Sequence, residues 1–240
     1  MNLAIDIGNS FQKVAVFNND EILFHQSFPA ISEKILTSVA ALFPVKYSIL
    51  SSVAGVSEHV IKFLNRSTTM VHYSHHTQLP IKILYKSAET LGLDRIANAV
   101  GAATQFPNQN VLSIQAGTCL VFDFVNANGE YLGGSISPGI TMRLETLHEK
   151  TKNLPQLRVK DTPQTFLGTT SEESILSGVV NGICYEIDGF IEDYKANFEN
   201  IMVLLTGGDA LLLQKLIKNT IFAAPNLVLK GLNEIIKYNV

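Results

Sequence analysis

Two stretches of the sequence, separated by about half of the chain, share a pattern that constrains the fold: an apolar run, a glycine turn and a second apolar run. They are LAIDIGNSFQKVAVF at 3–17 and VLSIQAGTCLVFDFV at 111–125. Aligning Gly8 with Gly117 places Asp6 opposite Gln115. Each copy predicts strand, turn and strand. The repeat therefore predicts a duplicated α/β fold with two lobes and a cleft.

The first copy has two interpretations. Alternation of apolar and polar residues around Gly-Asn-Ser is typical of a β-hairpin, in which Asp6 is only a polar residue near a turn. Alternatively, the small turn residues let backbone N–H groups face a phosphate, with Asp6 holding a hydrated Mg²⁺ beside it. This stretch alone supports both interpretations.

Composition narrows the class of protein. The 240 residues are 46% hydrophobic, which is enough for one large or two smaller packed domains. The net charge is −3, and the scattered Lys and Arg residues leave no basic surface for nucleic acid. Cys119 and Cys184 lie in apolar stretches, which favours buried thiols in a reducing compartment. Without a signal-peptide pattern or a membrane-spanning run, we expect a cytoplasmic protein that binds no membrane.

The rest of the chain alternates helix and strand patterns. Before the second copy, the sequence predicts helices at 31–43 and 57–65, a short buried strand with a turn at 47–56, and a closely packed, small-residue-rich helix at 94–106. After it, EYLGGSISPGI at 130–140 predicts a loop. Helices at 139–150 and 171–197, a strand at 200–208, a helix at 209–218 and the C-terminal segment 231–239 follow. The predicted lobes are residues 1–110 and 111–240.

A third glycine turn, LLTGGDA at 204–210, follows a predicted buried strand and precedes a predicted helix. On its own it suits an ordinary strand-to-helix turn with Asp209 as N-cap. Three such units resemble the phosphate 1, phosphate 2 and adenosine elements of the actin, sugar kinase and heat-shock ATPase superfamily. More narrowly, the chain resembles a type III pantothenate kinase, through DIGNS with Lys13, Tyr85 with LGLDR at 91–95, AGTCLVFD at 116–123, GGSISPG at 133–139, TGGDA at 206–210 and LVLKGLN at 227–233. The resemblance implies two ribonuclease H-like domains of the actin-like ATPase kind.

The resemblance also implies roles for individual residues. Asp94 would be the general base that takes the proton of the pantothenate hydroxyl, whereas taken alone it would be a helix N-cap beside a surface arginine. The implied pantothenate contacts are Tyr85, Gly92, Leu93 and Arg95, whose guanidinium suits oxyanions. Asp6 would hold Mg²⁺ through water. The implied nucleotide contacts are Asp6, Gly8, Asn9, Ser10, Lys13, Gly117, Thr118, Gly207 and Gly208.

Three positions depart from the pattern of that family. Gln115 stands where the second phosphate motif begins with Asp, and Val121 stands where it has Thr. Because a neutral amide is a weaker ligand for a hard cation than a carboxylate, we expect a weakened site for the monovalent cation, K⁺ or NH₄⁺, unless Asp123 or main-chain carbonyls complete it. Ser171 aligns with a pantothenate-contacting Thr of the family, with Thr170 as the nearby alternative.

The resemblance implies a homodimer that phosphorylates pantothenate with ATP and Mg²⁺, giving 4′-phosphopantothenate at the first step of coenzyme A synthesis. Two alternatives stay open at this point: another small-molecule kinase of the same superfamily, and a catalytically silent regulatory relative. Among the remaining reactive side chains, we interpret His75 and His76 as a solvated loop and Cys119 as a core thiol.

Overall fold

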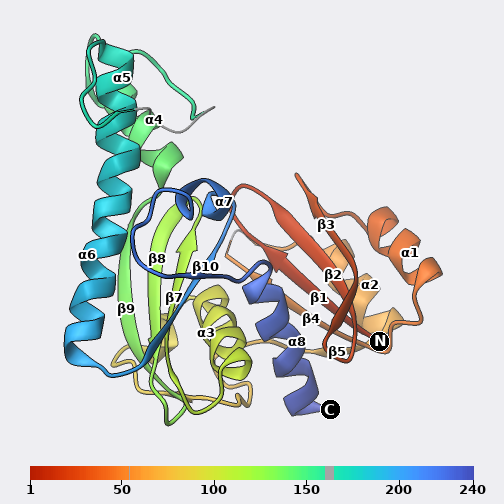
Figure 1. Ribbon diagram of the computed structural model, residues 1–240. Coiled ribbons are helices and arrows are strands. Elements are labelled where there is room, and N and C mark those ends of the chain that lie inside the picture. Colours follow the sequence, from red (N-terminus) through yellow and green to blue (C-terminus); the bar gives the residue numbers. More distant parts are fainter. Residues whose placement is uncertain (54, 160–164) are drawn as a thin grey trace. The chain divides into compact units, whose positions relative to one another are not determined.

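The computed structural model describes residues 1–53, 55–159 and 165–240. The turn predicted at the end of 47–56 includes residue 54, which lies outside the described residues. The chain forms two compact units (Figure 1). The first comprises residues 1–108, 125–133 and 226–240, and the second comprises 109–124 and 134–225. The boundary of the functional lobes at residue 110 stays a prediction, since these units are discontinuous in sequence.

The first unit is built on a five-stranded mixed sheet. Its order is β3-β2-β1-β4-β5, in which β1 pairs antiparallel with β2 and parallel with β4. The strands are β1 (Asn2–Ile7), β2 (Gln12–Asn18), β3 (Glu21–Phe28), β4 (Tyr47–Ser52) and β5 (Thr69–Val71). Its helices are α1 (Glu33–Leu42), α2 (Glu58–Ser67), the short 3₁₀ helix η1 (Ala88–Thr90), α3 (Leu93–Gln105) and α8 (Leu227–Asn239).

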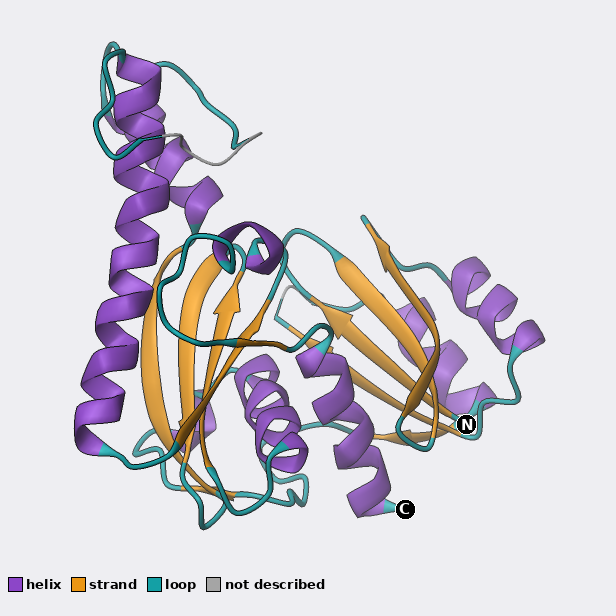
Figure 2. Ribbon diagram, viewed as in Figure 1, coloured by secondary structure: helices purple, strands orange, loops and turns teal. Residues whose placement is uncertain are grey.

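The second unit contains a sheet in the order β11-β10-β7-β8-β9, with β10 parallel to both β7 and β11. The strands are β7 (Asn110–Ala116), β8 (Cys119–Val125), β9 (Glu130–Pro138), β10 (Ile201–Thr206) and β11 (Phe222–Ala223). The helices are α4 (Ile140–Lys150), α5 (Ser171–Leu176), a π-helical segment (Ser177–Asn181), α6 (Gly182–Asn197) and α7 (Ala210–Leu213) (Figure 2). The first residues of β9, which belong to the first unit, pair with β6 (Lys82–Ile83).

The two sheets repeat one topology. Reading β3-β2-β1-β4-β5 beside β9-β8-β7-β10-β11 matches the strands one to one. In chain order, α1 lies between β3 and β4 and α2 lies between β4 and β5. Correspondingly, α4 to α6 lie between β9 and β10, and α7 lies between β10 and β11. A helix follows the last strand of each sheet, α3 after β5 and α8 after β11. The predicted duplicated α/β fold with mixed sheets and flanking helices is therefore confirmed.

Alternation along the strands produces the cores. In β1, Leu3, Ile5 and Ile7 pack into one apolar cluster of the first unit, while Ala4 belongs to the cluster on the opposite face, which α3 and α8 cover. Successive strand residues point to opposite faces, so one strand serves both clusters. The core of the second unit lies between its sheet and the helices α4 to α7.

Helices α3 and α8 pack side by side in the first unit (Figure 1). A Cβ on Gly231 would overlap the main-chain oxygen of Ala97, and one on Gly101 would lie 2.5 Å from the main-chain oxygen of Leu227. Only glycine permits this approach, because a larger residue would push the helix backbones apart. The predicted close packing of 94–106 is confirmed.

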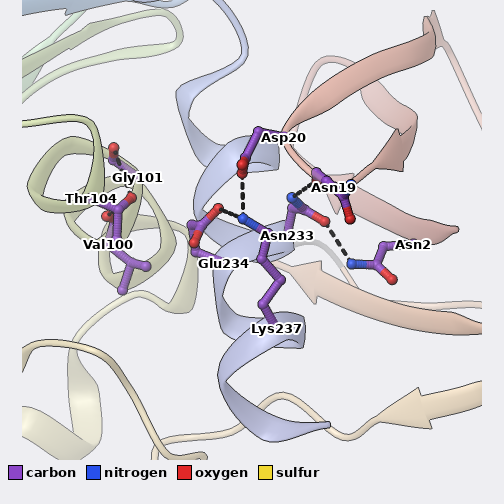
Figure 3. Close-up of polar contacts among 9 residues, drawn as sticks. All are labelled: Asn2, Asn19, Asp20, Val100, Gly101, Thr104, Asn233, Glu234 and Lys237. Atoms are coloured by element: carbon purple, nitrogen blue, oxygen red, sulfur yellow. Dashed lines mark hydrogen bonds and ion pairs between the residues drawn. The ribbon is translucent and has the colours of Figure 1, made fainter.

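Polar contacts fix α8 on the strands of the first unit (Figure 3). The buried Asn233 accepts a hydrogen bond from the Asn2 amide at 2.9 Å and donates one to the Asn19 carbonyl at 2.8 Å. Lys237 pairs with Asp20 and with Glu234. The C-terminal helix α8 is thus held against the sheet formed by the N-terminal strands.

Two local predictions were wrong. Residues 130–138 form β9 rather than a loop, because Gly134 lets β9 approach the Phe122 carbonyl more closely than a side chain would allow. The helix predicted over 209–218 ends at Leu213, after which i→i−4 and i→i−3 hydrogen bonds are mixed up to Ile217. The Asp188 carboxylate of α6 then accepts from the amides of Lys218 and Asn219, which holds this segment outside a helix.

Candidate active site

Asp6 is a buried carboxylate at the end of β1, only 8% exposed. It is aligned with Lys13 on β2 and with Ser51 on β4. Burial raises the pKa of Asp6 from its ordinary value of 3.8 to about 6, while Lys13 acts to lower it and the negative charge of Asp94 acts to raise it. Lys13 and Asp94 therefore both lie within electrostatic reach of Asp6 in the first unit.

The turn after Asp6 is the tip of a hairpin. The Gly8 amide donates to the Phe11 carbonyl at 3.2 Å, and a Cβ on Gly8 would lie 3.1 Å from that oxygen. Asn9 and Ser10 are exposed between them. The hairpin interpretation is thus correct, and it leaves the phosphate interpretation open because the exposed tip is next to Asp6.

Gly92, Asp94 and Arg95 start helix α3. Gly92 is the N-cap residue, so Asp94 lies in the first helical turn and does not cap it. A Cβ on Gly92 would lie 2.5 Å from Asp94 Oδ1, which means that the carboxylate folds back over the helix start. Arg95 is 8% exposed rather than a surface residue. The interpretation of Asp94 as an N-cap beside a surface arginine is therefore wrong.

Tyr85 lies against the start of α3. Its ring is 5.9 Å from the Arg95 guanidinium carbon, within range of a cation–π contact. It also stacks at a tilt against Tyr131, with ring centroids 6.0 Å apart. Gly133, at a φ of +126°, leaves space for this ring, since a Cβ there would lie 3.3 Å from it. Of the predicted pantothenate contacts, Tyr85, Gly92, Leu93 and Arg95 are thus brought together in the first unit.

Two residues that sequence reasoning missed hold this helix start. The Tyr73 hydroxyl donates to the Leu93 carbonyl at 2.8 Å, and His75 Nε2 lies 2.8 Å from the Leu91 carbonyl oxygen. Burial raises the pKa of Tyr73, and the charge of Asp94 adds to that effect. The interpretation of His75 as merely solvated is therefore wrong, whereas His76 is exposed. No motif signals such a contact, because it joins a loop to a helix twenty residues away.

In the second unit, three glycine segments meet at the ends of β7 and β10. The Gly139 amide donates to the Thr118 carbonyl at 3.0 Å, and the Asp209 amide donates to the Ala116 carbonyl at 3.1 Å. A Cβ on Gly139 would overlap the Gly117 carbonyl, and one on Gly207, whose φ is +101°, would overlap that of Ala116. The phosphate 2 and adenosine motifs are thus adjacent within this unit, and Gly208 is exposed beside them.

Gln115 and Asp123 also lie in the second unit. The side-chain oxygen Oε1 of Gln115 is buried and has no hydrogen-bond partner among the described residues. Asp123 is buried in β8, where its main-chain carbonyl accepts from the Ser113 hydroxyl at 3.4 Å. A buried amide oxygen offers a cation a dipole but no charge. Whether it forms a monovalent-cation site with Asp123 stays a prediction.

Thr170 and Ser171 begin α5. The Thr170 hydroxyl caps this helix by accepting from the Glu173 amide at 3.2 Å. Ser171 lines a mainly apolar cavity of about 710 Å³ together with Leu147, Leu154 and Ile175. The same cavity is lined by Pro138, which directly precedes Gly139, so Ser171 lies near one of the glycine segments of the second unit.

The chain has two further reactive side chains, the thiols of Cys119 and Cys184. Both cysteines are free; Cys184 is buried, and burial raises the pKa of its thiol to about 11. Cys119 is partly exposed, so the interpretation of this residue as a core thiol is wrong. Within the described ranges, no three His, Cys, Asp or Glu side chains gather as metal ligands. No helix in those ranges is long and apolar enough to cross a membrane.

Comparison with known proteins decides the family. The profile of the type III pantothenate kinases matches residues 2–193. The chain belongs to this family. A curated type III pantothenate kinase from Flavobacterium johnsoniae is 41% identical over 242 residues, covering 100% of this chain and 99% of that protein.

Solved structures agree on the fold. A ROK hexokinase from Thermus thermophilus superposes with a TM-score of 0.52 at 12% identity, over 99% of this chain and 98% of its own. A Campylobacter jejuni structure described as a Baf family transcriptional activator superposes with a TM-score of 0.55 at 21% identity, over 99% and 98% of the two chains. At these identities the likeness shows the fold alone, which this chain shares with both structures.

Proposed function

We propose that this member of the type III pantothenate kinase family transfers the γ-phosphoryl group of ATP to the hydroxyl group of pantothenate, forming 4′-phosphopantothenate and ADP. The proposal rests most directly on the first unit, where Asp94 at the start of α3 lies within electrostatic reach of the buried Asp6. Membership of the family indicates pantothenate as the substrate. The two carboxylates can have separate roles, with Asp94 acting on the acceptor hydroxyl and Asp6 holding the metal ion.

Asp94 acts as general base. The pantothenate hydroxyl oxygen forms a bond to the γ-phosphorus while the bond from that phosphorus to the β,γ-bridging oxygen breaks, and ADP departs with the bridging electron pair. The hydroxyl proton passes to the Asp94 carboxylate and then to solvent. Tyr73 and His75 position this carboxylate indirectly, by binding the carbonyls on either side of Gly92.

Arg95 and Tyr85 bind the acceptor. The guanidinium of Arg95 offers a fork of donors that suits the pantothenate carboxylate or a phosphoryl oxygen. Its burial and the Tyr85 ring restrict its orientation. Main-chain groups of Gly92 and Leu93 complete the acceptor contacts of the first unit. By resemblance to the family, Ser171 or Thr170 supplies a further hydroxyl to the acceptor.

The residues fit a hydrated Mg²⁺. Asp6 is a hard oxygen ligand of the kind that Mg²⁺ prefers, and Mg²⁺ in proteins commonly keeps several of its waters and binds through one or two carboxylates. Asp6 would hold Mg²⁺ through water, and the bound ion would supply positive charge against the phosphate oxygens. By resemblance to the family, Gly8, Asn9, Ser10, Lys13, Gly117 and Thr118 would contact phosphates, and Gly207 and Gly208 would leave room for adenosine.

Two finer points belong to the proposal. We expect a homodimer, which light scattering of the purified protein tests. We also expect only a weak requirement for K⁺ or NH₄⁺, because Gln115 replaces a carboxylate. We also expect a cytoplasmic location.

The test is direct product detection. The purified protein is incubated with pantothenate, ATP and Mg²⁺, with glucose and N-acetylmannosamine as alternative acceptors, and products are identified by mass spectrometry. Phosphopantothenate formed in step with ADP supports the proposal. Phosphorylation of a sugar in its place, or ATP turnover that no acceptor stimulates, contradicts it.

A further inference from the structure

Ser51 carries a buried hydroxyl that the fold does not use. The residue is 0% exposed, and its Oγ has no hydrogen-bond partner among the described residues. The other fully buried serines do have partners: Ser48 Oγ lies 2.6 Å from Thr68 Oγ1, and Ser113 donates to the Asp123 carbonyl. A buried hydroxyl group without a hydrogen-bond partner lowers the stability of the folded protein. Such a group is therefore more readily explained at a position where a bound ligand would supply the missing hydrogen bond.

The position of Ser51 places it at the proposed metal site. It lies near the end of β4, aligned with Asp6 in the parallel pairing of β1 and β4. Aligned residues of neighbouring strands point to the same face of a sheet, so the two side chains are neighbours. That face is covered by α3, since Ala4 and Ile49, two residues earlier on each strand, pack into its cluster.

The two cross-strand neighbours of Asp6 differ in chemistry. Lys13, aligned on β2, has an ammonium group that only donates hydrogen bonds and repels a cation. Ser51, aligned on β4, has a neutral hydroxyl that can accept. A metal-bound water that donates one hydrogen to Asp6 can therefore donate its second hydrogen to Ser51 but not to Lys13.

The repeat carries the same arrangement. In the second unit, Gln115 occupies the position of Asp6 and is aligned with Thr206 on β10, the counterpart of β4. Thr206 is buried, and the Gln115 side-chain oxygen is buried without a partner in the described residues. Both copies thus place a hydroxyl residue beside the polar residue that is next to last in the first strand.

We propose that Ser51 is a binding residue of the Asp6 magnesium site, where its hydroxyl accepts a hydrogen bond from a Mg²⁺-bound water that Asp6 also holds. The inference rests on the proposed function, which places Mg²⁺ at Asp6. It assigns Ser51 a role in metal binding and no role in proton transfer.

The experiment compares Ser51→Ala with the matched control Ser48→Ala. Binding of adenylyl imidodiphosphate, a non-hydrolysable ATP analogue, is measured by titration calorimetry over a series of Mg²⁺ concentrations, and thermal unfolding is measured without metal. Ser51→Ala should require about two- to tenfold more Mg²⁺ for half-maximal binding, the effect of losing one ordinary hydrogen bond. Its metal-free unfolding temperature should equal or exceed that of the wild type.

Ser48→Ala should show the opposite pattern, with unchanged Mg²⁺ dependence and a lower unfolding temperature, because it breaks the contact with Thr68. Ser51→Cys repeats the test with a side chain of similar volume that accepts weakly, and it should resemble Ser51→Ala. Wild-type Mg²⁺ dependence in both Ser51 variants overturns the inference, as does a loss of metal-free stability matching that of Ser48→Ala. If the wild type phosphorylates pantothenate in either case, the proposed function stands while the role of Ser51 falls.

Discussion

Asp6→Asn should stabilise the metal-free protein at neutral pH, although it removes a residue of the proposed site. The pKa of Asp6 is raised to about 6 mainly by burial, so the folded protein holds this proton more tightly than the unfolded chain does. The protonated Asp6 carboxyl therefore stabilises the folded state relative to the ionised form. This contribution is fully present below pH 3.8, the ordinary pKa, and is lost as the pH rises through about 6. An amide does not ionise and avoids this loss.

The free-energy cost of ionising Asp6 in the folded protein follows from the difference between its pKa values in the folded and unfolded states. Each pKa unit corresponds to about 1.4 kcal/mol, so ionised Asp6 costs roughly 3 kcal/mol above pH 7 and about half of that at pH 5. Because Asp6 is buried, solvent screening reduces this figure little. For a chain of this length, each kcal/mol moves the unfolding temperature by roughly 2–4 °C.

The assay is thermal and urea unfolding of wild type and Asp6→Asn between pH 5 and 8, with EDTA present. The advantage of the variant should grow by about 1–1.5 kcal/mol over that range. Adding Mg²⁺ and the ATP analogue should stabilise the wild type more than the variant. The exposed Asp20, whose pKa is lowered mainly by its hydrogen bond to Lys237, provides the control Asp20→Asn, which should show no such gain. A difference that stays constant with pH, or one that shrinks as pH rises, refutes the reasoning.

Three further predictions concern other parts of the chain. Tyr73→Phe should lower kcat by about threefold to tenfold while the Kd of the ATP analogue stays unchanged, because it frees the Leu93 carbonyl that fixes the start of α3; steady-state kinetics and calorimetry separate the two. Wild-type activity should depend weakly on K⁺ at constant ionic strength, and Gln115→Asp should increase that dependence; strong activation that is unchanged in the variant would remove position 115 from the cation site. Gly231→Ala should destabilise by about 1–3 kcal/mol because its Cβ overlaps a main-chain oxygen of α3, whereas Gly189→Ala, in open space on α6, should stabilise by about 0.5–1 kcal/mol; equal effects in urea unfolding would contradict the packing argument.

The sequence predicted the parts of the fold that local pattern controls. The two hairpins appear where alternation and glycine turns place them, and the small-residue pattern of 94–106 correctly indicated close helix packing. The match of the family profile confirms the resemblance on which the function prediction was based. Assigned roles of single residues stay predictions until they are tested.

The errors come from contacts between distant segments. The strand β9 was missed because Gly134 reads as a loop residue until the neighbouring Phe122 carbonyl is known. The predicted helix 209–218 was too long at its far end, where the amides of Lys218 and Asn219 bind Asp188, a carboxylate about thirty residues earlier. Likewise, Ser51 looks like an ordinary strand residue until the parallel register places it beside Asp6.

The central claim is that Asp94 takes the proton of the pantothenate hydroxyl, and Asp94→Asn tests it most directly. The measurement is the rate of phosphopantothenate formation at saturating ATP, Mg²⁺ and pantothenate, with calorimetry confirming that the variant still binds the ATP analogue. We predict a loss of roughly 10²- to 10⁴-fold in kcat with analogue binding retained, because an amide cannot accept the proton. Turnover close to that of the wild type would contradict the mechanism.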